Sequence, residues 1–359
     1  VVHGTRPPVR RSVPEIILYT KAMSAPQTHP GTGRNSLMSL PANGSKTVAG
    51  VLRLMALVVA VCLVYGPAMQ APFIFDDKVT IVENRSIRHL WPLVGGGEDG
   101  SPLSPQHGLP VSARPVVNLS FALNYHFGGI DPFGYRIVHV VVHLFSALLL
   151  WRIVSRTLRL ERFGGCFANV AEPLSFAVAL VWALHPAATE TLVYVTQRTE
   201  LTMGFFYLAT VYCSIRFWDA PHVTARSAWL VLATLSCSAG MLCKEVMVSA
   251  PVMVLLYERT FQTGTFRRAL RQSWPLYCCL ALAWIPLLII QFRGSVTPGA
   301  GFGRGATGWE WWFTQAKVIF LYLKLTIWPW PLVIHYEIPL FRSVADAWPW
   351  LLAAGLLGI

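Results

Sequence analysis

Long apolar runs limit what this chain can fold into. The run from Val48 to Met69 is long enough to cross a bilayer, which takes about 20 apolar residues. Similar runs recur along the chain, and 54% of the 359 residues are hydrophobic while only 13% are charged. An average soluble domain carries about twice that share of charge. The composition therefore predicts an integral membrane protein.

The positive charge is distributed as it is in membrane proteins. The formal net charge is +12, but the arginines concentrate between apolar runs and not along one amphipathic face. The densest short cluster, Arg152, Arg156, Arg159 and Arg162, directly follows the second apolar run. Because basic loops stay on the cytoplasmic side, this end is expected to be cytoplasmic. The pattern argues against a nucleic-acid partner.

The fold class expected is an all-α integral membrane protein, a polytopic helical bundle over residues 48–359 that follows a disordered, cytoplasmic N-terminal tail over 1–47. Spans are expected near 48–69, 135–153, 167–184, 201–216, 228–243, 246–257 and 274–292, with a further one from Trp348. The first outer loop, about 70–134, is expected to carry a surface helix near 114–125. A second, glycine-rich outer loop, about 293–308, has the composition of a lid. Residues 309–329 fit either a span or an interfacial helix.

Ionisable residues gather on one side of the membrane in this topology. The acidic pair Asp76 and Asp77 follows the first span, and a carboxylate at the bilayer centre costs about 2.5–3.5 kcal/mol, so the pair is expected just outside the hydrocarbon. The residues expected on the same outer face are Asp76, Asp77, Arg114, His185, Glu190, Arg198, Glu200, Lys244 and Glu245. Carboxylates suit a general base, and Arg or Lys suits an anionic leaving group such as a phosphate.

Several short motifs, in order, resemble a known family. They are Phe75-Asp76-Asp77, Arg114-Pro115-Val116, the segment 119–125, Gly134-Tyr135, His143, Leu184-His185-Pro186, Thr189-Glu190 and Arg198. This ordered set looks like the membrane half of the transmembrane and tetratricopeptide-repeat O-mannosyltransferase-like family and its bacterial relatives, over roughly residues 50–340. Those proteins belong to the GT-C class of polytopic glycosyltransferases. A tetratricopeptide-repeat domain is accordingly expected beyond the C-terminal end of this sequence.

The resemblance implies sugar transfer, mannose-like, from a polyprenyl-phosphate donor to a hydroxyl of a protein or glycan acceptor on the extracytoplasmic or lumenal face. The catalytic carboxylate maps onto Asp76 and Asp77. The residues expected to bind the donor phosphate or sugar are Arg114, His185, Glu190, Arg198 and Lys244. No cofactor is expected, and a divalent metal is left open. The membrane is the bacterial inner membrane, or the endoplasmic reticulum membrane in a eukaryote, with the N-terminus cytoplasmic.

Structural roles compete with these assignments. The Asp pair also fits a helix cap, His185-Pro186 fits the end of a span, and Glu190, Arg198 and Glu200 fit an ion-pair network. His139 and His143, one turn apart, favour core packing over a metal site. Trp309, Trp311, Trp312, Trp328 and Trp330 favour an interfacial belt over sugar stacking. At the level of the whole protein, the alternatives are a noncatalytic membrane anchor for a repeat scaffold and a secondary transporter.

Overall fold

The computed structural model describes residues 42–292, 307–333 and 336–357, and over these ranges it is helical, with one isolated β-bridge between Ser101 and Ser104. Packing divides the chain into Val1–Val48 and a larger unit, Ala49–Ile359. Most of the tail predicted over 1–47 and most of the glycine-rich loop at 293–308 lie outside the described residues. The predicted all-α fold is confirmed for the part that is described.

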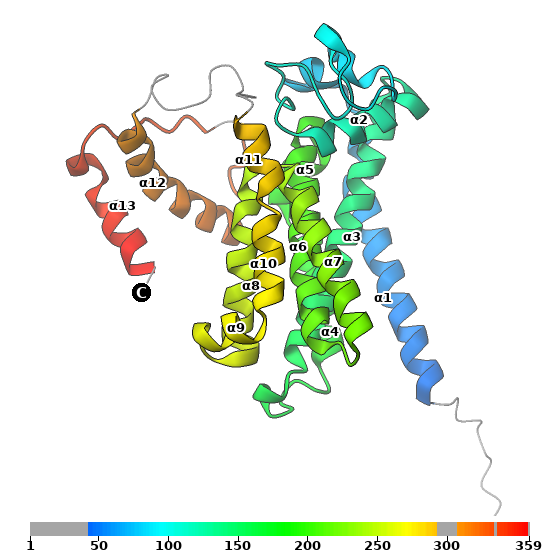
Figure 1. The fold of residues 1–359 in the computed structure, drawn as a ribbon, viewed down its shortest axis with the longest axis vertical. Helices are drawn as coiled ribbons and strands as arrows, with labels where there is room; N and C mark the ends of the chain where they lie inside the picture. Colours follow the sequence, from blue (N-terminus) through cyan, green and yellow to red (C-terminus); the bar gives the residue numbers. More distant parts are fainter. Residues whose placement is uncertain (1–41, 293–306, 334–335, 358–359) are drawn as a thin grey trace, which may run out of the picture. The chain divides into compact units, whose positions relative to one another are not determined.

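Helices occupy the predicted apolar runs (Figure 1), but where a span was predicted over 246–257 the helix α8 has only 8 residues, too few to cross a membrane. The α-helices of the described residues are α1 (Ala42–Tyr65), α2 (Pro115–Gly128), α3 (Pro132–Leu158), α4 (Ala171–Ala183), α5 (Thr189–Val193), α6 (Arg198–Asp219), α7 (Val223–Met241), α8 (Ala250–Tyr257), α9 (Phe266–Gln272), α10 (Trp274–Leu282), α11 (Ile285–Phe292), α12 (Gly308–Ile327) and α13 (Val344–Leu357). Helix α3 packs on α4 and α6, α6 packs on α7, and α12 packs on α13.

Three of the described helical segments are long and apolar enough to cross a membrane: Thr47–Ala68, Pro132–Leu158 and Trp274–Phe292. A fourth candidate is the pair formed by α4 and the segment Pro186–Val193, which are bent by 51° at the break between them. Helix α4 alone has 13 residues, or about 20 Å at 1.5 Å per residue, which is shorter than the hydrocarbon core. The chain is a membrane protein, and α4 with the segment after it has the geometry of a broken span or a re-entrant loop.

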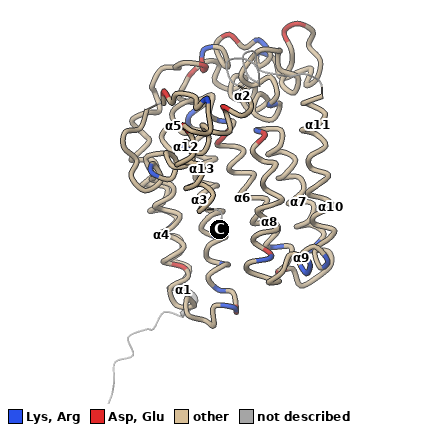
Figure 2. The backbone as a smooth tube through the Cα atoms, turned by 90° about the vertical axis from the view of Figure 1, so that its left-hand side faces the viewer, with Lys and Arg blue, Asp and Glu red and all other residues tan. Residues whose placement is uncertain are grey.

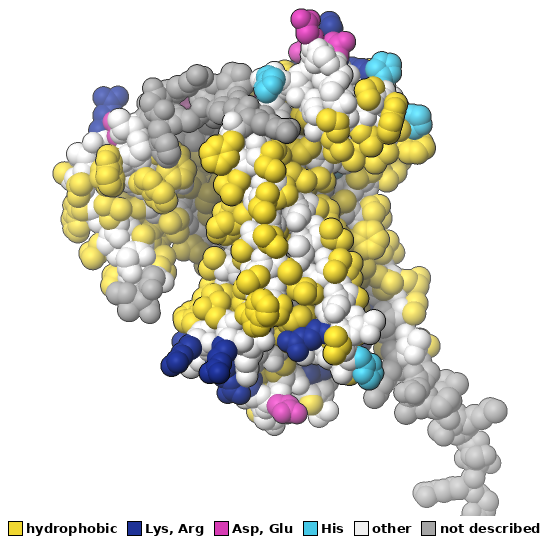
Figure 3. All heavy atoms as spheres, viewed as in Figure 1, with side chains coloured by type: hydrophobic (Ala, Val, Ile, Leu, Met, Phe, Trp, Pro, Cys, Tyr) yellow, Lys and Arg dark blue, Asp and Glu magenta, His cyan; other side chains and the backbone are white. Residues whose placement is uncertain are grey.

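The exposed side chains on the flanks of the helices agree with a membrane environment. Figure 3 shows apolar side chains covering the flanks of α7, α10 and α11, where Val231, Leu235, Leu282 and Ile289 are exposed. Lys and Arg positions lie mainly at the ends of the helices, around α9 and after α3, and the backbone trace between the ends carries few charged positions (Figure 2). This banding is the distribution expected of a protein that exposes its middle to lipid.

The helices begin where the sequence supplies caps. Asp131 accepts a hydrogen bond from the backbone N–H of Phe133 (3.1 Å), and Pro132 fills the first position of α3. Pro115 starts α2 in the same way, so the predicted surface helix near 114–125 is confirmed as a helix. Because α3 starts at Pro132, its residues Tyr135 and Arg136 lie in its opening turns, beside the first outer loop.

A close approach between α7 and the turn after it depends on Gly240. A Cβ atom on Gly240 would lie 2.6 Å from Sδ of Met247, whose side chain is fully buried. The same turn is closed by hydrogen bonds from the backbone N–H groups of Cys243 and Lys244 to the Gly240 carbonyl (3.0 and 3.1 Å). Gly240 thus sets the geometry of the segment that carries Lys244.

We predict that Gly240→Ala lowers the free energy of unfolding by about 1–3 kcal/mol, because the added methyl group overpacks a filled site. Thermal unfolding in detergent measures this change. In the double variant Gly240→Ala, Met247→Ala the space vacated by the sulfur accommodates the methyl group, so the two losses are expected to sum to less than their separate values. Strict additivity would contradict the contact.

Candidate functional site

The acidic pair lies in a tight turn after α1, and its two carboxylates have different environments. Phe75, just before the pair, has φ of +45°, a left-handed conformation that is rare for a residue with a bulky side chain. Asp76 is exposed, whereas Asp77 is completely buried. The turn therefore presents one carboxylate to the outside and directs the next into the protein.

The Asp77 carboxylate is saturated with donors from one distant segment and from its own turn. Its Oδ1 accepts hydrogen bonds from the backbone N–H (2.7 Å) and the hydroxyl (2.8 Å) of Thr196. Its Oδ2 accepts longer ones from the N–H groups of Val195 (3.4 Å) and Ile74 (3.3 Å). A buried carboxylate held by this many donors is a structural anchor, because each donor stabilises its charge.

Asp76 is accompanied by Tyr194, which belongs to the same distant segment as Thr196. The hydroxyl of Tyr194 accepts a hydrogen bond from the backbone N–H of Asp76 (3.3 Å), and its ring contacts that of Phe75 edge to face at 6.4 Å. Burial, together with the neighbouring Asp76 carboxylate, raises the pKa of Tyr194 to about 12. At neutral pH the phenol is protonated and fixes the turn that carries Asp76.

Arg136, near the start of α3, joins the turn to the opposite segment. It is fully buried, and its guanidinium donates to the carbonyls of Met69, Ala71 and Pro72 on one side and of Val193 on the other. The bonds to Val193 and Pro72 are both 3.0 Å long. These are the residues that precede Asp76 and Tyr194, so one side chain positions both halves of the site.

Arg198, at the first position of α6, is also fully buried. It donates to Oδ1 of Asn124 (2.6 Å), to the carbonyl of Tyr135 (2.8 Å) and to Ser120 (3.3 Å), and it lies over the ring of Phe121 with its Cζ 4.5 Å from the centroid. The side chain thus ties α2 and α3 to α6. Four of its donor contacts are directed at protein oxygens, away from the exposed surface.

The other two predicted cations lie at the rim and are paired with carboxylates. Lys244 forms an ion pair with Glu200, and both side chains are partly exposed. Arg114 lies 4.0 Å from Glu245 and donates to the carbonyl of Pro110 (2.9 Å). Both pairs contain partly solvated groups, so an anionic ligand has only weak pairs to displace.

His185 lies on the break between α4 and α5, and Glu190 lies in the first turn of α5. Nδ1 of His185 accepts from the N–H of Ala187 (3.2 Å) and caps η6 (Pro186–Ala188). Its Nε2 is then the protonated nitrogen, and it bonds to the carbonyl of Thr326 on α12 (3.0 Å). Glu190 is exposed and accepts from Gln197 (2.8 Å). His185 thus caps the segment after α4 and bonds to a backbone carbonyl.

A cavity of about 750 Å³ opens beside this break. It lies between α3, α4, α6 and α12, and its lining residues are His143, Ser146, Ala177, Val178, Val181, Trp182, His185, Ala187, Ala188, Thr191, Glu200, Leu201, Gly204 and Thr326. Most of these side chains are apolar, and the ionisable Glu200 and His185 belong to the acidic-pair end of the bundle. The cavity thus combines a long apolar wall with a polar end.

The two histidines of α3 are buried and bonded to backbone. A ring nitrogen of His139 lies 3.0 Å from the carbonyl of Thr191, and one of His143 lies 2.9 Å from that of Ala183. The His143 ring also stacks on Trp182. Among the residues that the structure describes, no group of three or more His, Cys, Asp or Glu side chains is arranged to hold a metal ion.

Sequence reasoning missed three residues of this site: Arg136, Tyr194 and Thr196. A signal was available for Arg136, since an arginine inside an apolar helix is expensive and usually has a specific partner. Tyr194 and Thr196 lie between the spans predicted near 167–184 and 201–216, but no local pattern distinguishes them from their neighbours. Their roles come from contacts with residues 118 and 119 positions earlier.

Together the fold and the site define a helical membrane protein that carries an exposed carboxylate and paired cations at one end of its bundle. Comparison with known proteins agrees with the sequence motifs. The chain is 30% identical over 224 residues to protein O-mannosyl-transferase Tmtc3 of Drosophila melanogaster, a match that covers 58% of this chain and 24% of the relative. It is 33% identical over 195 residues to Tmtc1 of the same organism, with 52% and 20% covered.

Human protein O-mannosyl-transferase TMTC4 is 29% identical over 196 residues, which cover 50% of this chain and 26% of the relative. The chain is thus a homologue of the TMTC proteins, and it spans about a quarter of the length of the curated relatives it matches. No model of a protein family matches the sequence, and no solved structure matches the chain.

We predict that Asp77→Asn lowers the free energy of unfolding by about 2–5 kcal/mol, because an amide nitrogen would face backbone donors and the buried charge-assisted bonds would be lost. Asp76→Asn, a matched change at an exposed position, is expected to shift it by less than about 0.5 kcal/mol. Thermal or denaturant unfolding of the two purified variants distinguishes them. Equal losses would show that the burial of Asp77 has no energetic consequence.

Proposed function

We propose that this chain forms the membrane part of a GT-C-type glycosyltransferase, which moves a sugar from a polyprenyl-phosphate carrier to an acceptor hydroxyl on the extracytoplasmic or lumenal face. The observation that carries the proposal is the pairing of an exposed Asp76 with a buried, hydrogen-bonded Asp77 in one strained turn. A strained turn costs free energy and persists only where surrounding contacts hold it, and such turns cluster at functional sites.

Asp76 is the general base in this proposal. Its carboxylate takes the proton from the acceptor hydroxyl as the oxygen attacks the anomeric carbon, the bond from that carbon to the phosphate oxygen breaks, and polyprenyl phosphate leaves with inversion of configuration. Asp77, Tyr194 and Arg136 position the turn and do not touch substrate. Support for this division comes from their burial and their bonds to backbone.

The cavity beside α4 and α5 fits the lipid part of such a donor. Its apolar wall suits an isoprenoid chain, and Glu200 at its lining is paired with Lys244. Lys244 and Arg114 are the proposed phosphate ligands, since both are partly exposed and only weakly paired. His185 and Glu190 are proposed to bind the sugar or phosphate at the break. For Arg198 we propose a positioning role, because its guanidinium is buried among protein oxygens.

The names of the relatives suggest the sugar and the acceptor. They are described as protein O-mannosyl-transferases, which indicates mannose as the sugar and a protein hydroxyl as the acceptor. The alternative, a noncatalytic anchor for a repeat scaffold, requires no exposed carboxylate. Neutralisation of Asp76 therefore separates the two functions.

We predict that Asp76→Asn reduces sugar transfer by about 10²–10⁴-fold, the contribution of a positioned general base. The assay measures release of polyprenyl phosphate from labelled polyprenyl-phosphate mannose by the purified protein in detergent, with thermal unfolding as the check on folding. Asp99→Asn is the matched control, because Asp99 lies in the same loop, is exposed and pairs only with exposed Arg85.

Asp99→Asn is expected to retain activity within about threefold, as a surface ion pair contributes little. A folded Asp76→Asn protein with full activity would contradict the general-base role. A wild type that transfers nothing from a panel of donors would favour the scaffold.

A second prediction addresses the cavity. A side chain at Gly204 would meet no atom within 4 Å of its Cβ, so Gly204→Leu is expected to fold and to fill part of the cavity. The KM for a long-chain donor should rise by about tenfold, while the KM for a donor with one or two isoprene units should change little. Gly50→Leu on α1 is the control, because its Cβ position is equally open and lies outside the cavity. Equal effects on long and short donors would argue against lipid in the cavity.

A further inference from the structure

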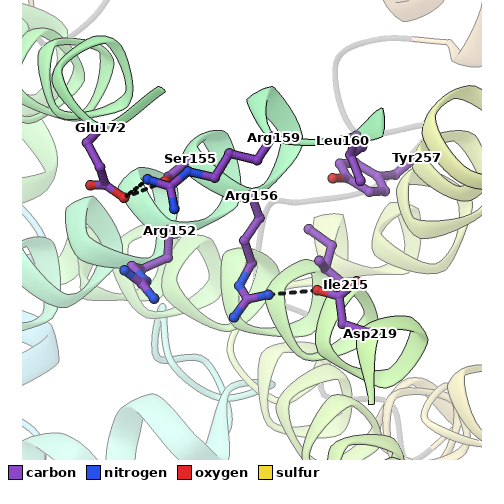
Figure 4. A pocket seen from close by; sticks show the side chains of 9 residues that line it. All are labelled: Arg152, Ser155, Arg156, Arg159, Leu160, Glu172, Ile215, Asp219 and Tyr257. Carbon is purple, nitrogen blue, oxygen red and sulfur yellow. Dashed lines mark hydrogen bonds and ion pairs between the residues drawn. The ribbon is translucent and has the colours of Figure 1, made fainter. Parts of the chain in front are cut away.

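A second, smaller cavity lies at the other end of α3, away from the acidic pair. Its volume is about 300 Å³, and Figure 4 shows its lining residues, which are Arg152, Ser155, Arg156, Arg159, Leu160, Glu172, Ile215, Asp219 and Tyr257. They come from the end of α3, the start of α4, the end of α6 and the end of α8. Three guanidinium groups and two carboxylates face one small space.

The two carboxylates are already committed. Glu172 accepts hydrogen bonds from Trp151 (3.2 Å), Ser155 (2.8 Å) and Arg159 (2.8 Å). Asp219 accepts one from Nη1 of Arg156 (2.7 Å). Glu172 pairs with Arg159, and Asp219 pairs with Arg156. Arg152 has no carboxylate partner among the lining residues, so the cavity carries one uncompensated positive charge.

One donor group stays available for a ligand. Arg152 has no hydrogen-bond or ion-pair partner within the described ranges, and its side chain is exposed. Arg156, four residues later, lies on the same face of α3 and pairs with Asp219. Figure 4 shows both side chains at the cavity. An anion with several oxygens would accept hydrogen bonds from the unpaired guanidinium of Arg152.

The position of Arg152 identifies the source of that anion. Helix α3 is one of the helices long and apolar enough to cross a membrane, and Arg152 lies near its end. Val141 and Phe145, 11 and 7 residues earlier, share its helical face and are exposed. An apolar stripe that leads to a free arginine is suited to an acyl chain followed by a phosphate. Free phosphate would make no use of the stripe.

We propose that this cavity binds the headgroup phosphate of an anionic membrane phospholipid, with the guanidinium of Arg152 as its ligand. This site is independent of the sugar-transfer proposal, since it lies at the opposite end of α3 from the acidic pair. The bound lipid would fix the end of α3 at headgroup depth.

The test is lipid binding to the purified protein in neutral detergent, measured by native mass spectrometry and by the shift in unfolding temperature. Short-chain phosphatidylglycerol is expected to bind at least tenfold more tightly than short-chain phosphatidylcholine. Arg152→Gln should weaken phosphatidylglycerol binding by about tenfold without unfolding the protein, because no described residue pairs with Arg152. Arg267→Gln on α9 is the control, because Arg267 is also exposed and lies outside the cavity, so its replacement should leave binding unchanged.

Three results would overturn the proposal. One is equal binding of the two lipids by the wild type. Another is an equal loss of phosphatidylglycerol binding in Arg152→Gln and Arg267→Gln, which would reflect general surface charge. The third is competition by inorganic phosphate at the same concentrations as phosphatidylglycerol, which would make the cavity a site for free phosphate.

Discussion

Two buried arginines organise the end of the bundle that carries the acidic pair. A guanidinium removed from water costs several kcal/mol unless its donors are met. Arg136 meets this requirement with backbone carbonyls of the turn after α1 and of the segment before Tyr194. Arg198 bonds to Tyr135, Ser120 and Asn124, although its Nε is buried without an acceptor among the described residues. Because carbonyls are fixed to the chain, these bonds hold whole segments in place. The outer loop therefore has a defined path across the helix ends.

That fixed path gives two adjacent carboxylates different chemistry. Asp77 enters the protein and is bound by Thr196 and Val195, while Asp76 stays at the surface beside Tyr194. A carboxylate enclosed by protein donors cannot contact a substrate, whereas an exposed one can. A similar division is found at the other end of α3. Glu172 and Asp219 accept hydrogen bonds from protein groups, whereas Arg152 has no partner among the described residues.

Much of the architecture was predictable from sequence, because hydrophobic runs and helix caps act locally. The helices near 48–69, 135–153 and 274–292, a helix near 114–125 and the resemblance to the TMTC proteins are confirmed. The placement of the helix near 114–125 on the membrane surface stays a prediction. The span predicted near 167–184 is instead the first arm of a bent pair. The predicted roles of Asp76, Arg114 and Lys244 stay predictions. Arg198 was predicted at the phosphate, but its partners are three protein groups on α2 and α3, which no local pattern encodes.

The sequence by itself determined that this is a helical membrane protein with an acidic pair at the edge of its first span, because apolar length and the cost of buried charge depend on composition alone. The tertiary structure decided which carboxylate is buried. Asp76 and Asp77 are chemically identical neighbours, and contacts with the segment 194–196, almost 120 positions later, distinguish them. Long-range hydrogen bonds of this kind leave no periodic trace in a sequence, so they become visible only when the chain is folded.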